Sequence, residues 1–451
     1  MSEGRTVRGR RRPRRLAAAA AVVAVVLAAA ALVVTNRGPA LDARSGAAAE
    51  GSGPASGSAT AGPAGSASST RLPVADDLLD AGQVARLGGP RRWTVLRTDA
   101  NTSGDGLNSV CQQQRFADPR GLAALVRVFR APGAVRRSAV QSVEVSRSPA
   151  AAQRAYRTTL GWYAECRLAR LRLVEAFAVE QVGNQAQVLT LRVEGRRATT
   201  IRVAVARTGA LVTATVSGSV GVRPPHVGQV VGALGDAVRN LCGSRAAGRC
   251  VARPTYRPLA APPPAPGEEP GLLSAADLPP VGRVDRPWVA TAATRTRRPA
   301  GSPSVTPCAR ADFLAAGATR SRTRTYLIPG AGLADRFGLS ETYGSFRSRR
   351  VADRFVSGVR AGLRGCERRA LSTRVGPERR TARGSPPVRT FSWLLTVTVA
   401  AGEMVPVRVA VVRVGRHVAQ LTFTPAPGAD LSPSDFAGVL DRAGDRLREL
   451  A

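Results

Sequence analysis

The chain contains the same sequence pattern twice, and this repeat restricts the folds that are open to it. Segments 71–252 and 271–451 of the 451 residues carry matching blocks in the same order. LLDAGQVARLG before Trp93 matches LLSAADLPPVG before Trp288, and RVAVARTGALV matches RVAVVRVGRHV. Matching blocks in one order indicate a tandem duplication. We therefore predict two domains of one topology, joined in series.

Each copy has the pattern of helix, strands, helix, strands, helix. Alternation of apolar and polar residues predicts strands over 200–206, 211–217, 390–399, 406–412 and 417–424. The middle helix should begin after Ser148 in the first copy and after Ser348 in the second, because serine is a preferred N-cap residue. Hairpin turns are expected at 207–209 and 413–415. The leading and closing helices should cover one face of an antiparallel sheet, which makes each copy an α+β domain.

The N-terminal residues predict a membrane anchor. Residues 1–15 contain seven arginines, and residues 16–34 are uncharged and apolar. At about 1.5 Å per residue a helix over 16–34 spans about 28 Å, close to the hydrocarbon core of a bilayer. The arginines keep residues 1–15 in the cytoplasm as a tail, so the rest of the chain lies outside the membrane. A cleaved secretory signal is the alternative, although its apolar core is usually shorter.

Two segments of biased composition separate the anchor and the copies. Residues 35–70 are mostly Gly, Ala, Ser and Pro, which bury too little apolar surface to offset the entropy of ordering. We predict a disordered stalk there. Residues 253–270 are rich in proline and predict a stiffer linker between the two domains.

The repeat also assigns partners to the six cysteines. A nucleophilic thiol would need an adjacent base, and the two histidines do not occupy equivalent places in the copies. A zinc site would need ligands at short spacing, and the sequence has none. We therefore predict structural disulfides and no metal site. The predicted pairs are Cys111 with Cys166, Cys308 with Cys366, and Cys242 with Cys250.

The chain is strongly basic, with 66 basic residues, all of them arginine, against 31 acidic residues. A basic surface attracts polyanions, so the membrane and anionic cell-wall polymers are candidate partners. A compositional bias towards arginine without a binding role is the alternative. Nucleic acid is not expected, because aromatic residues are few and no zinc-finger, RNP or helix-turn-helix pattern is present.

The sequence lacks the motifs of common enzymes. It has no G-x-S-x-G elbow, no H-E-x-x-H motif and no phosphate loop with its lysine. Carboxylates are sparse and no pair of them recurs in both copies, which argues against a two-acid hydrolase. We predict that the protein is not an enzyme and needs no cofactor.

Four arginines recur beside the middle helix, namely Arg147 and Arg154 in the first copy and Arg347 and Arg354 in the second. The spacing within each pair places both side chains on one face across two turns. Converging guanidinium groups can hold a phosphate or a carboxylate, so these four are candidate ligand-binding residues. A solvated face is the alternative.

Trp162 and Tyr163 are a second recognisable feature, at the end of the middle helix of the first copy. The second copy has Gly362 and Leu363 in their places, which a binding site shared by both copies would not explain. We therefore expect the two aromatic side chains in the core of the first domain.

The opening LL-x-A helix, the following tryptophan, Cys111 and the stretch RSPAAAQRAYRTTLGWYAEC (147–166) resemble the PknH-like extracellular sensor domain of actinobacteria. Domains of that family lie outside the membrane, on receptor Ser/Thr protein kinases or on secreted proteins and lipoproteins. The resemblance implies an α+β fold with an antiparallel sheet, a cleft for an unknown ligand and two disulfides per domain. The second copy has only Cys308 and Cys366 and departs from this pattern at its closing end. Residues 1–15 are too few to form a kinase.

These features together predict a single-pass protein of the bacterial cell envelope, with its N-terminus in the cytoplasm and two sensor-like domains outside. We expect it to bind an envelope ligand or a membrane protein partner without a catalytic output of its own. The alternative is a structural tether that holds anionic cell-wall polymers through its basic surface.

Overall fold

The computed structural model describes residues 71–88, 92–132, 137–221, 223–258, 269–296, 307–309, 311–400 and 402–451. The cytoplasmic tail, transmembrane helix and stalk expected over 1–70 lie outside these residues. Within the described ranges, no helix is both long enough and apolar enough to span a bilayer.

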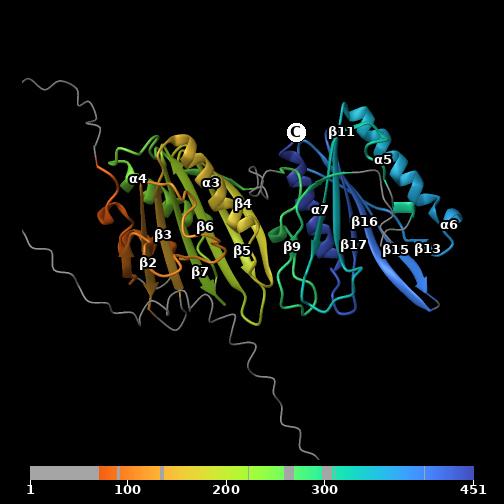
Figure 1. The fold of residues 1–451 in the computed structure, drawn as a ribbon, viewed down its shortest axis with the longest axis horizontal. Helices are drawn as coiled ribbons and strands as arrows, with labels where there is room; N and C mark the ends of the chain where they lie inside the picture. Colours follow the sequence, from red (N-terminus) through yellow and green to blue (C-terminus); the bar gives the residue numbers. More distant parts are fainter. Residues whose placement is uncertain are drawn as a thin grey trace, which may run out of the picture.

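The first module, residues 71–258, is built on an eight-stranded antiparallel sheet with the spatial order β1-β2-β3-β7-β6-β5-β4-β8 (Figure 1). The strands are β1 (Thr94–Asp99), β2 (Ala123–Ala131), β3 (Arg137–Val145), β4 (Leu171–Glu180), β5 (Gln185–Val193), β6 (Thr199–Thr208), β7 (Leu211–Val220) and β8 (Thr255–Pro258). The helices are η1 (Ala75–Asp77), α2 (Ala81–Val84), η2 (Ala85–Leu87), α3 (Pro149–Ala164) and α4 (Val227–Leu241).

The second module, residues 269–451, has a nine-stranded sheet whose main order is β10-β11-β12-β17-β16-β15-β13, with β9 paired to β11 and β14 to β15. Its strands are β9 (Val289–Ala290), β10 (Thr294–Arg295), β11 (Ala318–Leu327), β12 (Gly338–Phe346), β13 (Thr373–Val375), β14 (Arg379–Arg383), β15 (Val388–Ala400), β16 (Glu403–Val414) and β17 (His417–Thr424). Its helices are η3 (Ala275–Asp277), η4 (Pro307–Ala309), α5 (Arg349–Arg364), α6 (Cys366–Arg369) and α7 (Pro433–Arg448). The central strands therefore follow the same path in both modules.

Each sheet is covered by helices on both faces. In β6, Val203 and Val205 pack in the apolar cluster under α3, whereas the alternate residues Ala204 and Ala206 pack in the cluster with α4. Successive side chains of a strand point to opposite faces, so α3 and α4 lie on opposite sides of the sheet. The leading helix α2 shares the α4 side, as expected from the sequence, and the middle helix forms a third layer. The predicted α+β class is confirmed.

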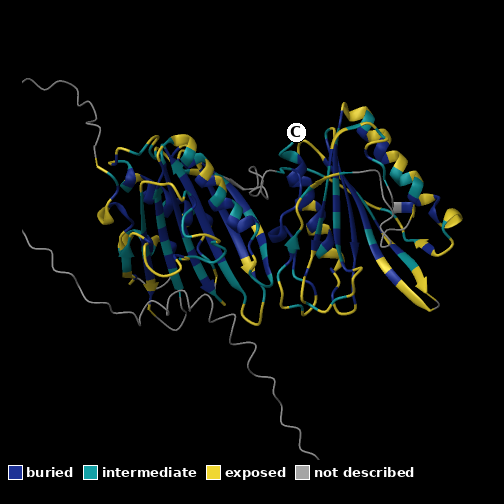
Figure 2. Ribbon diagram, in the orientation of Figure 1, coloured by how far each residue is buried: buried dark blue, intermediate teal, exposed yellow. Residues whose placement is uncertain are grey.

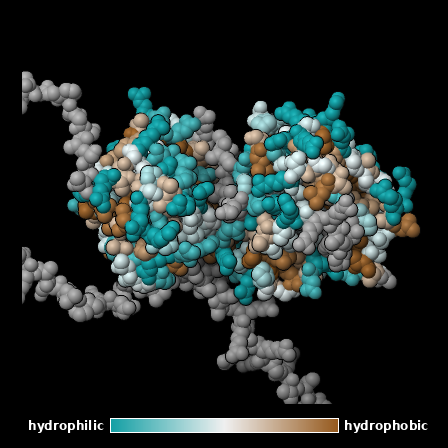
Figure 3. All heavy atoms as spheres, turned by 45° about the horizontal axis from the view of Figure 1, so that its top comes forward, coloured by the Kyte–Doolittle hydropathy of each residue, from teal (hydrophilic) through white to brown (hydrophobic). Residues whose placement is uncertain are grey.

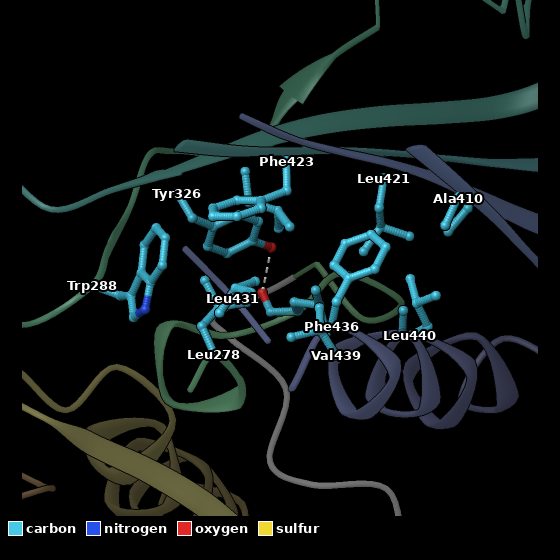
Figure 4. Close-up of a cluster of buried hydrophobic side chains, with 14 of the residues drawn as sticks. Leu278, Trp288, Tyr326, Ala410, Leu421, Phe423, Leu431, Phe436, Val439 and Leu440 are labelled. Carbon is cyan, nitrogen blue, oxygen red and sulfur yellow. Dashed lines mark hydrogen bonds between the residues drawn. The ribbon is translucent and has the colours of Figure 1, made fainter. Parts of the chain in front are cut away.

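The second module repeats this arrangement with α5 on one face and α7 on the other. Figure 2 shows its central strands buried and the outer face of α5 exposed. On the α7 side, Tyr326 lies among Trp288, Phe423 and Leu431, and its hydroxyl group donates a 2.7 Å hydrogen bond to the Leu273 carbonyl (Figure 4). The bond satisfies the one polar atom that this aromatic side chain brings into the core.

Local signals in the sequence are matched by the structure. Ser148 caps α3 by accepting a hydrogen bond from the Ala151 amide at 3.2 Å, and Ser348 caps α5 in the same way. The hairpin turns begin at Gly209 and Gly415, whose φ angles of 56° and 55° favour glycine. Turns were expected over 207–209 and 413–415. In the structure each turn starts at the last of these three residues, and the two residues before it belong to β6 or β16.

Residues 255–258 fall in the segment expected as a linker, and they form the edge strand β8. Tyr256 makes an edge-on contact with Phe177 of β4, with ring centroids 5.9 Å apart. This apolar contact and a short antiparallel ladder attach the segment to the first sheet.

The modules touch where η3 of the second packs against α3 and β4 of the first (Figure 1). Ala276 of η3 is buried in the apolar cluster beneath α3. Arg442 of α7 donates hydrogen bonds to the Leu173 and Val174 carbonyls of β4 at 3.3 and 3.1 Å. The junction thus joins the α3–β4 end of the first module to the η3–α7 face of the second.

Candidate functional site

The first module contains a polar cavity with a volume of about 30 Å³. It lies between the loop that follows β1, strands β3 and β7, and the C-terminal half of α3. A buried water needs about 10–15 Å³ of such volume, so the cavity has room for about two water molecules or one small polar group. Its polar and aromatic lining residues are Asn101, Asn108, Ser109, Gln112, Arg115, Phe116, Ser142, Glu144, Thr159, Trp162 and Tyr163.

The loop over the cavity is fixed by its own hydrogen bonds. Asn101 has a φ of 56°, a backbone conformation that asparagine tolerates better than most residues. Its side-chain amide donates to the Gly106 and Arg115 carbonyls at 3.1 and 3.0 Å. Asn108 donates to the Asn101 side-chain oxygen at 2.8 Å. These bonds hold the loop in a fixed conformation over the cavity.

A disulfide ties this cover to the end of α3. Cys111 in the loop is bonded to Cys166, with 4.7 Å between their Cα atoms. Ser109 and Tyr163, which flank the disulfide in sequence and both line the cavity, have hydroxyl groups 3.1 Å apart. The disulfide therefore holds a hydroxyl pair at the cavity wall.

Glu144 supplies the carboxylate of the cavity. One of its oxygens accepts from the Ala117 amide at 2.9 Å and the other from the Asp118 amide at 2.8 Å. Burial raises the pKa of Glu144, although the two backbone hydrogen bonds oppose that shift. Burial also raises the pKa of Tyr163 to about 12, so its phenol stays protonated at neutral pH. The cavity therefore offers hydroxyl groups and hydrogen-bond acceptors, and its lining contains no histidine and no thiol.

The second module has aromatic rings beside the place that corresponds to the cavity. Phe355 of α5 stands where α3 has Ala155, and Phe346 stands where the first module has Ser146. Phe313 lies 4.5 Å from Phe355 between ring centroids and packs directly over Gly344. In the first module, Gly344 corresponds to Glu144. The first module thus has a carboxylate at the cavity wall where the second module has a glycine covered by an aromatic ring.

The four arginines predicted to bind a ligand are all exposed. Arg147 donates from Nε to the Arg120 carbonyl at 3.0 Å. Arg154 lies on the solvent side of α3, and Arg347 and Arg354 lie at the start of α5. None of the four lines the cavity, so the structure does not bring them to it.

The three predicted disulfides are confirmed: Cys111 with Cys166, Cys242 with Cys250, and Cys308 with Cys366. No free cysteine remains among the described residues. The repeat sufficed to pair Cys111 with Cys166 and Cys308 with Cys366, because equivalent positions in the two copies meet in the same way. Cys242 and Cys250 were paired as the two neighbouring cysteines that remained.

Trp162 and Tyr163 lie in the core, as expected, with exposed fractions of 7% and 2%. Both also line the cavity, a role that the sequence argument did not assign to them. The sequence argument did not identify four further lining residues, namely Asn101, Asn108, Gln112 and Glu144. The signal that could have found the three amide residues is the amide-rich loop 101–114 of the first copy, which has no counterpart of like composition in the second. No signal in the sequence marks Glu144.

Across the described ranges, no group of three or more histidine, cysteine, aspartate or glutamate side chains could hold a metal ion. No protein-family model, curated protein or solved structure matches this chain. The resemblance to the PknH-like sensor domain therefore remains a prediction from the sequence.

Proposed function

We propose that the protein is an anchored, extracytoplasmic binding protein of the cell envelope, whose first module binds a small neutral ligand at the cavity beneath the Cys111–Cys166 loop. The observation that carries the proposal is the cavity itself. Three disulfides and the absence of free thiols in the described residues support an oxidising compartment. The apolar segment 16–34 supplies the anchor.

The chemistry of the lining favours a hydroxyl-bearing ligand. Tyr163 and Ser109 present hydroxyl groups, Glu144 presents acceptors, and Trp162 presents an apolar surface. Binding pockets commonly combine an aromatic surface with a few fixed polar groups. The volume admits one hydroxymethyl group, so we infer that a sugar or polyol inserts such a group and leaves the rest of its structure outside the cavity.

Thermal shift and tryptophan fluorescence of the full-length protein in detergent test this proposal with glucose, galactose and glycerol as probes, each of which carries a hydroxymethyl group. At least one probe should raise the melting temperature. Tyr163→Phe should weaken its binding about tenfold, because a buried hydrogen bond to the ligand is lost. Tyr343→Phe is the matched control, since it removes a buried hydroxyl from the second module. The proposal is contradicted if Tyr163→Phe and Tyr343→Phe bind the probe with equal affinity. It is also contradicted if no probe raises the melting temperature.

A second candidate function is binding of an anionic cell-wall polymer. The start of α5 carries exposed Arg347, Arg349, Arg350 and Arg354, and the surface in Figure 3 is largely hydrophilic. Such binding should fall steeply with salt, as counterion release requires of a contact with a polyanion. Teichoic acid retention by the full chain at low and physiological salt measures it. Retention that does not change with salt, or that survives Arg349→Gln with Arg350→Gln, argues against it.

A further inference from the structure

The junction between the modules covers a charged face of the second module. Asp277 of η3 and Arg446 of α7 form an ion pair at 2.7 Å, and both side chains are fully buried. Arg442, one turn earlier on α7, lies 3.4 Å from Asp277 and donates to the β4 carbonyls of the first module. Arg324 of β11 lies 3.5 Å from Glu165 of the first module. We call this surface the covered face.

The same surface of the first module is open to solvent. By sequence correspondence, Gln83 takes the place of Asp277, and Asn240 takes the place of Arg446. Gln83 and Asn240 exchange side-chain hydrogen bonds of 3.2 and 3.0 Å. Gly82 is exposed, whereas its counterpart Ala276 is 1% exposed. We call this surface the open face; a depression there is lined by Asp76, Leu78, Asp80, Gln83, Arg127 and Asn240.

The two faces match in backbone as well as in sequence. Arg127 donates to the Leu79 carbonyl at 2.9 Å, and Arg324 donates to the corresponding Leu273 carbonyl at 3.4 Å. Likewise the Leu79 amide donates to Gln141 at 2.7 Å, and the Leu273 amide donates to Glu341 at 2.9 Å. The open face therefore has the framework of a surface that, elsewhere in the same chain, receives the α3–β4 end of a module.

The second module has an end of that type against which no other described element packs. Its counterpart of the α3–β4 end is the segment from the last turn of α5 through α6 to β13, which we call the free end. Leu371 in this segment is 94% exposed, the highest value among the exposed large apolar side chains of the described residues. Figure 1 places the open face at one tip of the molecule and the free end at the other.

The two surfaces carry opposite charges at several positions. Exposed Arg364, Arg368 and Arg369 lie at the free end together with Glu367, and exposed Asp76 and Asp80 lie on the open face together with Arg127. Opposite charges on two matching surfaces favour association and fix its register.

We propose that copies of this chain assemble head to tail, with the free end of one copy docked on the open face of the next. The contact uses the backbone framework that the open face shares with the junction, and it buries Leu371 near Gly82. Asp236 stands where the junction has Arg442, so the hydrogen bonds of Arg442 to β4 have no equivalent in it. The contact joins two different surfaces, so it has no twofold axis, and a dimer still has one unused open face and one unused free end. Each added copy then presents a new open face or free end. The assembly therefore grows with concentration and does not stop at a dimer.

Sedimentation velocity of the full-length chain in detergent tests this proposal. The wild-type mass should rise steadily with protein concentration. Gly82→Arg places a long charged side chain on the open face, and Leu371→Asp removes the apolar contact of the free end. Each variant alone should stay monomeric, with its self-association weakened at least tenfold. An equimolar mixture of the two should form a dimer and nothing larger, because one free end and one open face remain intact.

Controls separate this contact from other causes. Leu327→Asp changes an exposed leucine on β11, at the opposite edge of the sheet from β13, and should associate like the wild type. Asp76→Arg is a second open-face variant, in case Gly82→Arg does not fold, and should behave like it. Dimer formation in the mixture itself shows that both partners are folded. A wild type that is monomeric at every concentration overturns the proposal, as does association that survives both single substitutions.

Discussion

The two modules share one fold, and they differ under the middle helix and at the η–α face. Under the middle helix the first module is the more polar one, and at the η–α face the second module is the more charged one. Under the middle helix, the first module has a polar cavity and the second has packed Phe313, Phe346 and Phe355. At the η–α face, the first module has the neutral pair Gln83 and Asn240, and the second has a buried ion pair.

The largest expected effect concerns the buried ion pair. Arg446→Ala leaves Asp277 without its closest cation in a site excluded from water, which costs about 3–5 kcal/mol. The double variant Asp277→Gln with Arg446→Asn copies the pair of the first module and should recover at least half of that loss. Urea denaturation followed by tryptophan fluorescence measures both values. A double variant that is no more stable than Arg446→Ala would show that the two faces are not equivalent.

The next effect concerns the aromatic core of the second module. Phe355→Ala gives the second module the residue that the first module has at this position. Because contacts are lost and a cavity is left, the free energy of unfolding should fall by about 3 kcal/mol. Phe355→Leu fills most of the volume and should cost less than half as much. Equal losses for the two variants would indicate that this position is not tightly packed.

A pH dependence should distinguish Glu341 from its neutral counterpart Gln141. Burial raises the pKa of Glu341 from 4.5 to about 7 in the folded protein. The folded state then holds a proton that the unfolded state releases, so the contribution of this group is complete below pH 4.5 and is lost as the pH rises through about 7. Stability should therefore fall between pH 5 and pH 8.

Glu341→Gln should remove part of this slope and raise stability at pH 8 by on the order of 2 kcal/mol. Part of the slope will remain, because burial also raises the pKa of Glu449 to about 7. Melting temperatures at pH 5, 6.5 and 8 compare the variant with the wild type. Parallel curves for the two proteins would exclude a proton on Glu341.

The smallest expected effect tests what the modules have in common. Ser148→Ala and Ser348→Ala each remove an N-cap hydrogen bond from the middle helix, at a cost of about 1 kcal/mol. The two losses should agree within about 0.5 kcal/mol, because the caps have the same geometry. A clear inequality would mean that α3 and α5 do not begin in equivalent ways.

Local and repeated features of the chain could be predicted from its sequence. The disulfide partners followed from the equivalence of Cys111 with Cys308 and of Cys166 with Cys366, and the helix starts followed from Ser148 and Ser348. The cavity could not be predicted, because its walls come from a loop without periodicity and from strands far away in the chain. Glu144, for example, faces the loop only because β3 pairs with β7 in one register.

The junction escaped prediction for a similar reason. Asp277 and Arg446 look like surface charges in the sequence, and they lie 169 positions apart. In the structure they are buried together, between η3 and α7 at the junction with the first module. The contrast with Gln83 and Asn240 is visible in the aligned copies and would have marked the face that differs.

The number of ligand molecules bound per chain shows whether the first module binds the ligand and the second does not. Isothermal titration of the full-length protein with the sugar that shifts its melting temperature should give one site per chain. Tyr163→Leu, which introduces the residue of the second module at a lining position of the cavity, should abolish that site. Two sites per chain, or one site that Tyr163→Leu leaves intact, would contradict binding by the first module alone.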